Sequence, residues 1–178
     1  MKKIFIGLLV LTMCACSLNL AGNPKDKVKE FLDKYKNQDA DVLNDLDEII
    51  SSEYKGDNKD RYKTLMINQY KDMEYDIVDE VIEDKKAIVT VDIKVYDYSK
   101  ALEYSNNYLS KHKDEFLKEV TDDIDQDKYT KYKLDEMEKV SDKRTYTINF
   151  VLNKKNNDWE LAPLNNSDIE KIHGVYIE

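Results

Sequence analysis

The stretch Ala87–Tyr96, A-I-V-T-V-D-I-K-V-Y, is apolar at every second position, and most of the positions between are polar. Successive side chains of a β-strand point to opposite faces of the sheet, so this alternation predicts a half-buried strand. The buried face consists of Ala87, Val89, Val91, Ile93 and Val95. Burying its four branched side chains stabilises the fold by on the order of 6–12 kcal/mol before conformational entropy is subtracted. Other parts of the chain must therefore cover this face.

Three more segments alternate in the same way and predict, with Ala87–Tyr96, two antiparallel hairpins. They are Met73–Ile82, Tyr146–Leu152 and Trp159–Leu161. Val78 and Val81 break the alternation of the first segment, which indicates a β-bulge or a change of register. The turns Glu83–Lys86 and Lys154–Asp158 connect the strands within each hairpin.

The segments before, between and after the hairpins have the apolar spacing of helices. The expected helices are Pro24–Asn37, one capped by Asp39 or Asp41, one capped by Asp57 or Asn58, Ser99–Val120, a less regular one from Gln126, and a closing turn capped by Ser167. The order of elements predicts a single α+β domain over residues 24–178. Its N-terminal helices pack on one face of a curved four-stranded antiparallel sheet, and Ser99–Val140 is a helical insertion between the hairpins.

The first residues have the pattern of an export signal. Lys2 and Lys3 precede an uncharged apolar run, Ile4–Ala15, that is shorter than the roughly 20 residues needed to span a bilayer. The run ends in M-C-A-C, Met13–Cys16, which resembles the cleavage box of bacterial lipoproteins. This resemblance implies a signal peptide over residues 1–15, a lipidated Cys16, and a tether over residues 16–23. The alternatives are lipidation of Cys14 and an ordinary secretory signal.

Charge and cysteine content narrow the function classes. The chain has 28 basic and 37 acidic residues, and removing Lys2 and Lys3 changes its net charge from −9 to −11. This balance argues against nucleic acid or a bare anionic membrane surface as partners, so we expect attachment to the membrane through acyl chains on its extracytoplasmic face. Beyond Cys16 there is no other cysteine, and the mature chain has no internal disulfide and no thiolate metal site.

The order of elements, K-A-I-V-T-V-D-I at Lys86–Ile93 and N-N-D-W-E-L at Asn156–Leu161 resemble one known superfamily. It is that of nuclear transport factor and ketosteroid isomerase, and specifically the Gram-positive lipoproteins that carry such a domain after a lipid-anchored cysteine. The resemblance implies a cone-like fold. It transfers no catalytic residue, because the chain has no matching catalytic motif.

Two groups of residues resemble metal or catalytic sites in part. Asp123, Asp125 and Asp127 have the spacing that opens a calcium loop, but Lys128 stands where such a loop needs glycine and Leu134 where it needs glutamate. We therefore interpret them as a solvated acidic linker. His112 lies on the inward stripe of its expected helix and is assigned a hydrogen-bonded packing role, while His173 completes a C-terminal helical turn. We expect no metal and no cofactor.

The chain contains 13 tyrosines, a residue with apolar area and a polar tip that suits binding surfaces and cavity rims. Tyr75 and Tyr146 are the candidate ligand-binding residues, because both point to the apolar face of the sheet near strand starts. The sequence offers an anchor and a scaffold without a recognisable nucleophile, base or metal set, which favours a surface-tethered binding module for a protein, peptide or small ligand. The alternatives are a small enzyme acting in the cone cavity and a structural subunit of an envelope assembly.

Overall fold

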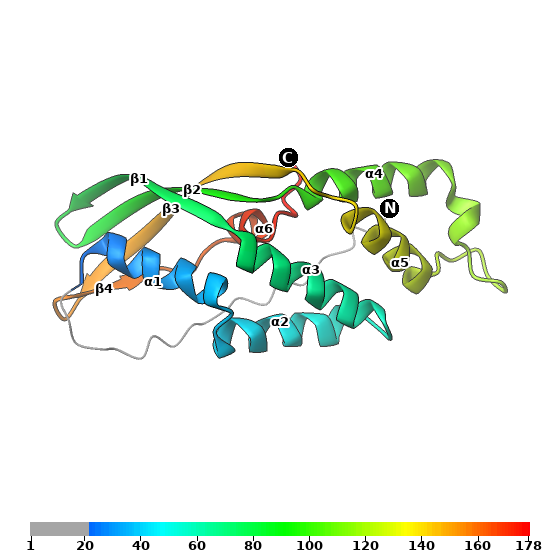
Figure 1. Ribbon diagram of the computed structural model, residues 1–178, viewed down its shortest axis with the longest axis horizontal. Helices are drawn as coiled ribbons and strands as arrows, with labels where there is room; N and C mark the ends of the chain where they lie inside the picture. The colour runs from blue at the N-terminus through cyan, green and yellow to red at the C-terminus, as the bar shows by residue number, and fades with distance from the viewer. Residues whose placement is uncertain (1–21) are drawn as a thin grey trace.

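The computed structural model describes residues 22–178, so the expected signal peptide, Cys16 and most of the tether lie outside the described residues. The described chain is an α+β domain in which helices pack on a four-stranded antiparallel sheet, as the sequence predicts (Figure 1). In chain order the elements are α1 (Pro24–Asn37), α2 (Ala40–Glu53), α3 (Asn58–Asp72), β1 (Glu74–Glu83), β2 (Lys86–Tyr96), α4 (Tyr98–Lys111), η1 (Lys113–Phe116), α5 (Gln126–Met137), β3 (Lys143–Lys155), β4 (Asp158–Leu161) and α6 (Asn166–His173).

Strand β2 lies inside the sheet, whose order is β1-β2-β3-β4. Its five alternating apolar residues from Ala87 to Val95 are all fully buried, which confirms the predicted inner face. The register of β1 against β2 shifts between Ile77 and Asp79, so the bulge predicted from the broken alternation is present at Val78. The other apolar strand, β3, pairs with β2 along its length and adds Ile148 and Phe150 to the same face.

Three helices cover this inner face. Helix α1 starts with Pro24 at its first position, and the side chain of Asn23 accepts a hydrogen bond from the backbone N–H of Lys25. Its buried residues Val28 and Leu32 face the sheet, while α2 packs on α3 as an outer layer. Both α3 and α6 also contact β2. The inner face is therefore filled by side chains from α1, α3 and α6.

The insertion differs from the expected long helix. Helix α4 ends at Lys111, His112 leaves the helical conformation, and η1 turns the chain back. Val120, the last residue of the expected helix Ser99–Val120, lies outside any helix and is 92% exposed. The turn allows Phe116 to pack on α5, where it is 3% exposed, and a straight helix would have carried that ring into solvent. The predicted second helix from Gln126 is confirmed as α5.

The C-terminal segment is locked to α3 and β2 by a buried amide. Gln69 is fully buried; its Nε2 donates to the carbonyl oxygens of Tyr96 (3.1 Å) and His173 (2.9 Å), and its Oε1 accepts from the Tyr96 N–H (2.8 Å). Gly174 ends α6 with φ of +71° directly against this group. Asn165, and not the predicted Ser167, caps α6, because its side chain is the one placed to accept from the N–H of Asp168.

Candidate functional site

Tyr75 and Tyr146, the residues predicted to bind a ligand, lie in one cross-strand row on the inner face with Ile93 between them. Two strand spacings put their backbones about 10 Å apart. Tyr146 is 5% exposed and donates to the carbonyl oxygen of Tyr176, while half-buried Tyr75 donates to Asp33 Oδ1 at 2.6 Å. Both hydroxyls thus bond to protein groups, and a ligand-binding role for them stays a prediction.

A histidine and a tyrosine contact each other in the interior of the domain, and this contact has a structural role. The Tyr70 hydroxyl lies 3.1 Å from Nε2 of His173, and the two side chains are 2% and 8% exposed at the residue level. Burial lowers the pKa of His173 to about 4 and raises the pKa of Tyr70, so both groups are neutral at pH 7. His173 ends α6 as predicted, but it does so inside the core. A substrate would have to displace α3 or α6 to reach this pair.

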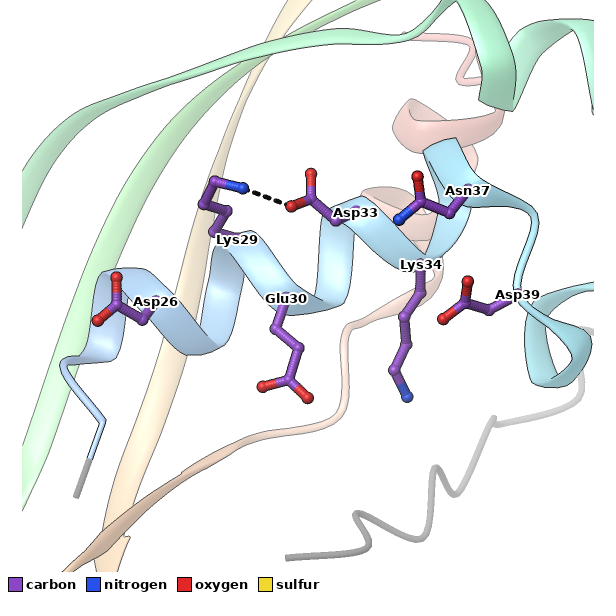
Figure 2. Close-up of a pocket in the computed structure, with 7 residues that line it drawn as sticks. All are labelled: Asp26, Lys29, Glu30, Asp33, Lys34, Asn37 and Asp39. Atoms are coloured by element: carbon purple, nitrogen blue, oxygen red, sulfur yellow. Dashed lines mark hydrogen bonds and ion pairs between the residues drawn. The ribbon is translucent and has the colours of Figure 1, made fainter. Parts of the chain in front are cut away.

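The surface of α1 carries a shallow polar depression of about 340 Å³ (Figure 2). Its lining residues come from α1 and the turn that follows it: Asp26, Lys29, Glu30, Asp33, Lys34, Asn37 and Asp39. Lys29 pairs with Asp33 at 2.5 Å and Lys34 with Asp41 at 2.9 Å. Hydrogen bonds from Lys29 and then Tyr75 lower the pKa of Asp33. All of these side chains except that of Asp39 come from one convex helix, so the depression does not enclose a ligand.

The most distinctive group of side chains lies in the insertion, where six rings form an aromatic cluster. They are Tyr104, Tyr108, His112, Phe116, Tyr129 and Tyr132. We call α4, η1 and α5 with their connecting loop the aromatic lobe. It forms the end of the molecule opposite the two hairpin turns (Figure 1). Tyr104, Tyr108 and His112 are spaced four residues apart and therefore lie along one face of the chain in and just after α4.

Tyr108 is the centre of the cluster. Its ring stacks on His112 with a centroid distance of 4.1 Å and an interplanar angle of 12°, and on Tyr132 of α5 at 4.9 Å and 25°. Phe116 meets Tyr108 edge-on at 87°, and meets Tyr129 at 79°. Edge and stacked contacts of this kind add roughly 0.5–1.5 kcal/mol each to simple area burial. These contacts fix α4 and α5 relative to each other.

Hydrogen bonds orient the rings and leave an acidic rim. The Tyr108 hydroxyl donates to Glu115 (3.0 Å), whose carboxylate also lies 3.1 Å from Nδ1 of His112. The bond to Glu115 raises the pKa of Tyr108. The His112 imidazole thus lies beside a carboxylate, but its side chain is 45% exposed, so the predicted position on the inward side of the helix is wrong. Tyr129 donates to Asn106 at 2.7 Å and links the two helices again.

The lobe also exposes apolar side chains. Tyr104 is 54% exposed at the end of the row of rings, and the 92% exposed Val120 lies in a small hairpin-like loop. That loop is closed by backbone hydrogen bonds from Asp125 to Phe116 (2.7 Å) and from Lys118 to Asp123 (3.0 Å). An amphipathic aromatic surface of this type suits protein contact, because tyrosine combines large buried area with few rotatable bonds.

The helical spacing of Ser99–Val120 puts Tyr108, Phe116 and the predicted His112 on one face, but that face does not include Tyr104, and nothing in it points to Tyr129 or Tyr132. The available signal was the repeat of an aromatic or imidazole ring at every fourth position from Tyr104 to Phe116. Tyr129 and Tyr132 repeat the pattern at a spacing of three. Rings at every fourth position of a helix lie on one face, so this spacing predicts a row of contacting rings.

The acidic segment before α5 has a local structural role. Asp125 caps the helix, because its Oδ1 accepts from the backbone N–H groups of Asp127 and Lys128, both at 3.1 Å. Asp123 accepts a bond from the hydroxyl of Thr121. Across residues 22–178, no three His, Cys, Asp or Glu side chains are grouped to hold a metal ion. Within the same residues, no helix has both the length and the apolar character to cross a bilayer.

Comparisons with known proteins add little to this geometry. The chain matches no protein-family model, and no curated protein matches it. Membership of the nuclear-transport-factor superfamily therefore stays a prediction. Among solved structures, the chain is similar to a crystal structure named a putative lipoprotein (ycdA) from Bacillus subtilis, with 15% identity and a TM-score of 0.39. The likeness covers 88% of this chain and 48% of that one, so the chain spans about half the length of that protein.

Proposed function

We propose that this protein is a binding module tethered to the extracytoplasmic face of the cell membrane by a lipid on Cys16, and that its aromatic lobe contacts a partner protein. The observation that carries the proposal is the aromatic cluster with exposed Tyr104 and Val120 at one end of the domain. The contrast with the interior supports it: the inner face of the sheet is filled with side chains, whereas the insertion exposes apolar and aromatic groups.

The position of α1 supports a partner site away from the membrane. Lys27 pairs with Asp158 (3.2 Å) and Lys25 with Glu80 (3.5 Å), so the first turn of α1 lies beside the hairpin end of the sheet. From there β2 and α4 lead to the lobe and are separated by Asp97 alone (Figure 1). The rise per residue of a strand and of a helix gives a distance on the order of 45 Å between the hairpin end of the sheet and Tyr104 in the lobe. A short tether over residues 16–23 would hold the hairpin end near the bilayer and the lobe away from it.

The anchor is tested with Cys16→Ser. The substituted protein should be released to the medium or accumulate as an uncleaved precursor, because the sulfur that receives the diacylglycerol group is missing. Wild-type protein should partition into detergent and carry the mass of the acyl chains. Identical mass and detergent partitioning of the two proteins would refute lipid attachment at this residue.

The lobe is tested by site-specific photo-crosslinking in cells. A benzoyl-phenylalanine at position 104 should give a defined adduct with another protein, whereas the same group at the exposed position of Glu48 on α2 should not. A second substitution, Val120→Lys, should reduce the yield from position 104 by at least fivefold. Equal yields from positions 104 and 48, or no adduct from position 104, would refute the lobe as the contact surface.

The same exposed lobe would also suit a structural subunit of an envelope assembly, since filled cores with apolar surface patches are typical of subunits. The size of the crosslinked species distinguishes a binding module from an assembly subunit. A single adduct of one additional chain supports a binding module, while a ladder of several chains that Val120→Lys removes supports an assembly subunit.

A further inference from the structure

The two edge strands of the sheet, β1 and β4, differ, and β1 is the open edge. Strand β4 is four residues long and α1 packs beside it, whereas β1 is ten residues long and, within residues 22–178, pairs with β2 alone. An edge strand presents unpaired backbone N–H and C=O groups to any extended chain that approaches it. The bulge at Val78 interrupts this edge, so an uninterrupted run of pairing positions is limited to Asp79–Glu83.

The apolar side chains of β1 are unusually exposed. Val78, Val81 and Ile82 are 52%, 46% and 51% exposed, and they are half of the large hydrophobic side chains with high exposure in residues 22–178. On the outer face Val81 begins a cross-strand row that continues through Ile88 and Val151. On the inner face Ile82 lies beside Ala87. A fifth strand would therefore have apolar neighbours on both faces.

The charge of β1 is entirely negative. Its charged residues are Glu74, Asp76, Asp79, Glu80 and Glu83, with no lysine or arginine. Asp76 also lies directly opposite Asp92 of β2, which adds a second carboxylate to the outer face. One oxygen of Glu80, Oε1, is buried without a hydrogen-bond partner among the described residues, although its Oε2 lies 3.5 Å from Lys25. Basic side chains of this chain reach Glu74 through Lys143 and Glu80 through Lys25, whereas Asp79 and Glu83 have no ion pair to a lysine or arginine among residues 22–178. A basic side chain of a partner would supply donors to these carboxylates and to the buried Glu80 oxygen.

We infer that the Asp79–Glu83 edge of β1 binds an extended, basic segment of another protein as a fifth strand. The order of side chains defines the complement: positions opposite Asp79 and Glu80 are basic, those opposite Val81 and Ile82 apolar, and that opposite Glu83 basic. Backbone bonds to β1 provide the attachment and the cross-strand side-chain pairs provide the register. A second copy of this chain does not fit, because pairing two β1 edges puts carboxylates opposite carboxylates.

The probe is a synthetic peptide with the core Lys-Ile-Val-Lys-Lys, flanked by serine and glycine, which meets these positions in antiparallel orientation. The readout is the change in amide chemical shift of the full-length folded protein. Shifts should concentrate on β1 from Asp79 to Glu83. A peptide of identical composition with the core Lys-Ile-Lys-Val-Lys places lysine against Val81 and valine against Glu80, and it should bind at least fivefold more weakly. The same loss is expected when the peptide amides that face β1 are N-methylated.

Two substitutions of equal chemistry complete the test. Val81→Lys adds a positive charge in the middle of the site and should abolish binding, while Ile177→Lys, at an exposed apolar position outside β1 and the aromatic lobe, should leave it unchanged; matching thermal midpoints show that both variants fold. Equal binding of the reordered or N-methylated peptide would overturn strand addition in favour of charge attraction alone. No binding of the first peptide, shifts outside β1, or a dimer of the free protein that Val81→Lys removes would each overturn the inference. The site is separate from the aromatic lobe, so failed crosslinking at Tyr104 would not affect it.

Discussion

Acidification should destabilise the fold through His173. Its pKa falls from 6.5 to about 4 because burial disfavours the imidazolium ion. The unfolded chain therefore takes up a proton at a higher pH than the folded one, and the free energy of unfolding decreases as the pH falls below about 6.5. A shift of this size corresponds to about 3.4 kcal/mol when the pH is below 4, of which about 2 kcal/mol is already lost at pH 5.

The measurement is urea unfolding at pH 7.5 and pH 5, monitored by the fluorescence of Trp159. His173→Gln keeps a hydrogen-bonding amide near the Tyr70 hydroxyl but does not titrate, so its unfolding free energy should lose about 2 kcal/mol less than that of the wild type over this interval. Burial raises the pKa of the Asp45, Glu53 and Glu170 carboxyls, which opposes the loss equally in both proteins. An equal loss in His173→Gln and wild type would refute the assignment.

Three further predictions concern local features. Gly174→Ala should lower the free energy of unfolding by at least about 3 kcal/mol in the same assay, because a Cβ there overlaps the carbonyl of Tyr96 and the amide of Gln69. Gly56→Ala is the control: no atom lies within 4 Å of its Cβ, so its free energy of unfolding should fall by only about 1–2 kcal/mol. Trp159 is 8% exposed, so its emission should be blue-shifted in the native protein and Trp159→Ala should lose about 3–5 kcal/mol; a water-like emission maximum would contradict this. Amides of the exposed segment 121–123 should exchange hydrogen much faster than those of 89–93, and strong protection on adding millimolar calcium would contradict the assigned capping role of the acidic segment.

Patterns that act within one element were sufficient to predict most of the fold. The alternation of Ala87–Tyr96 leaves only one arrangement that buries its branched residues, and the break at Val78 follows from the same rule. Helix α1 was predictable because its first proline and its apolar spacing agree. In each case the residues that determine the structure are neighbours in the sequence.

Features that depend on distant contacts were not predictable in the same way. The apolar stripe through Phe116 and Val120 is compatible with a continuous helix, and only the presence of Tyr129 and Tyr132 on α5 makes the turn at His112 favourable. The aromatic lobe therefore requires knowledge of the packing of α4 on α5. The negative edge of β1 was visible as composition, but its exposure follows from the order of strands in the sheet.

The hydrogen bonds of Gln69 also set an order of events during synthesis. Its partners lie 27 and 104 residues further along the chain, at Tyr96 and His173. A nascent chain that lacks α6 would leave part of this buried amide unsatisfied and the Tyr70 ring uncovered, and both defects oppose folding. Stable folding thus requires that α6 has been made, because this helix supplies the last partner of the Gln69 amide and covers the Tyr70 ring. The core of the domain can therefore close only after residues on both sides of the aromatic lobe have been synthesised.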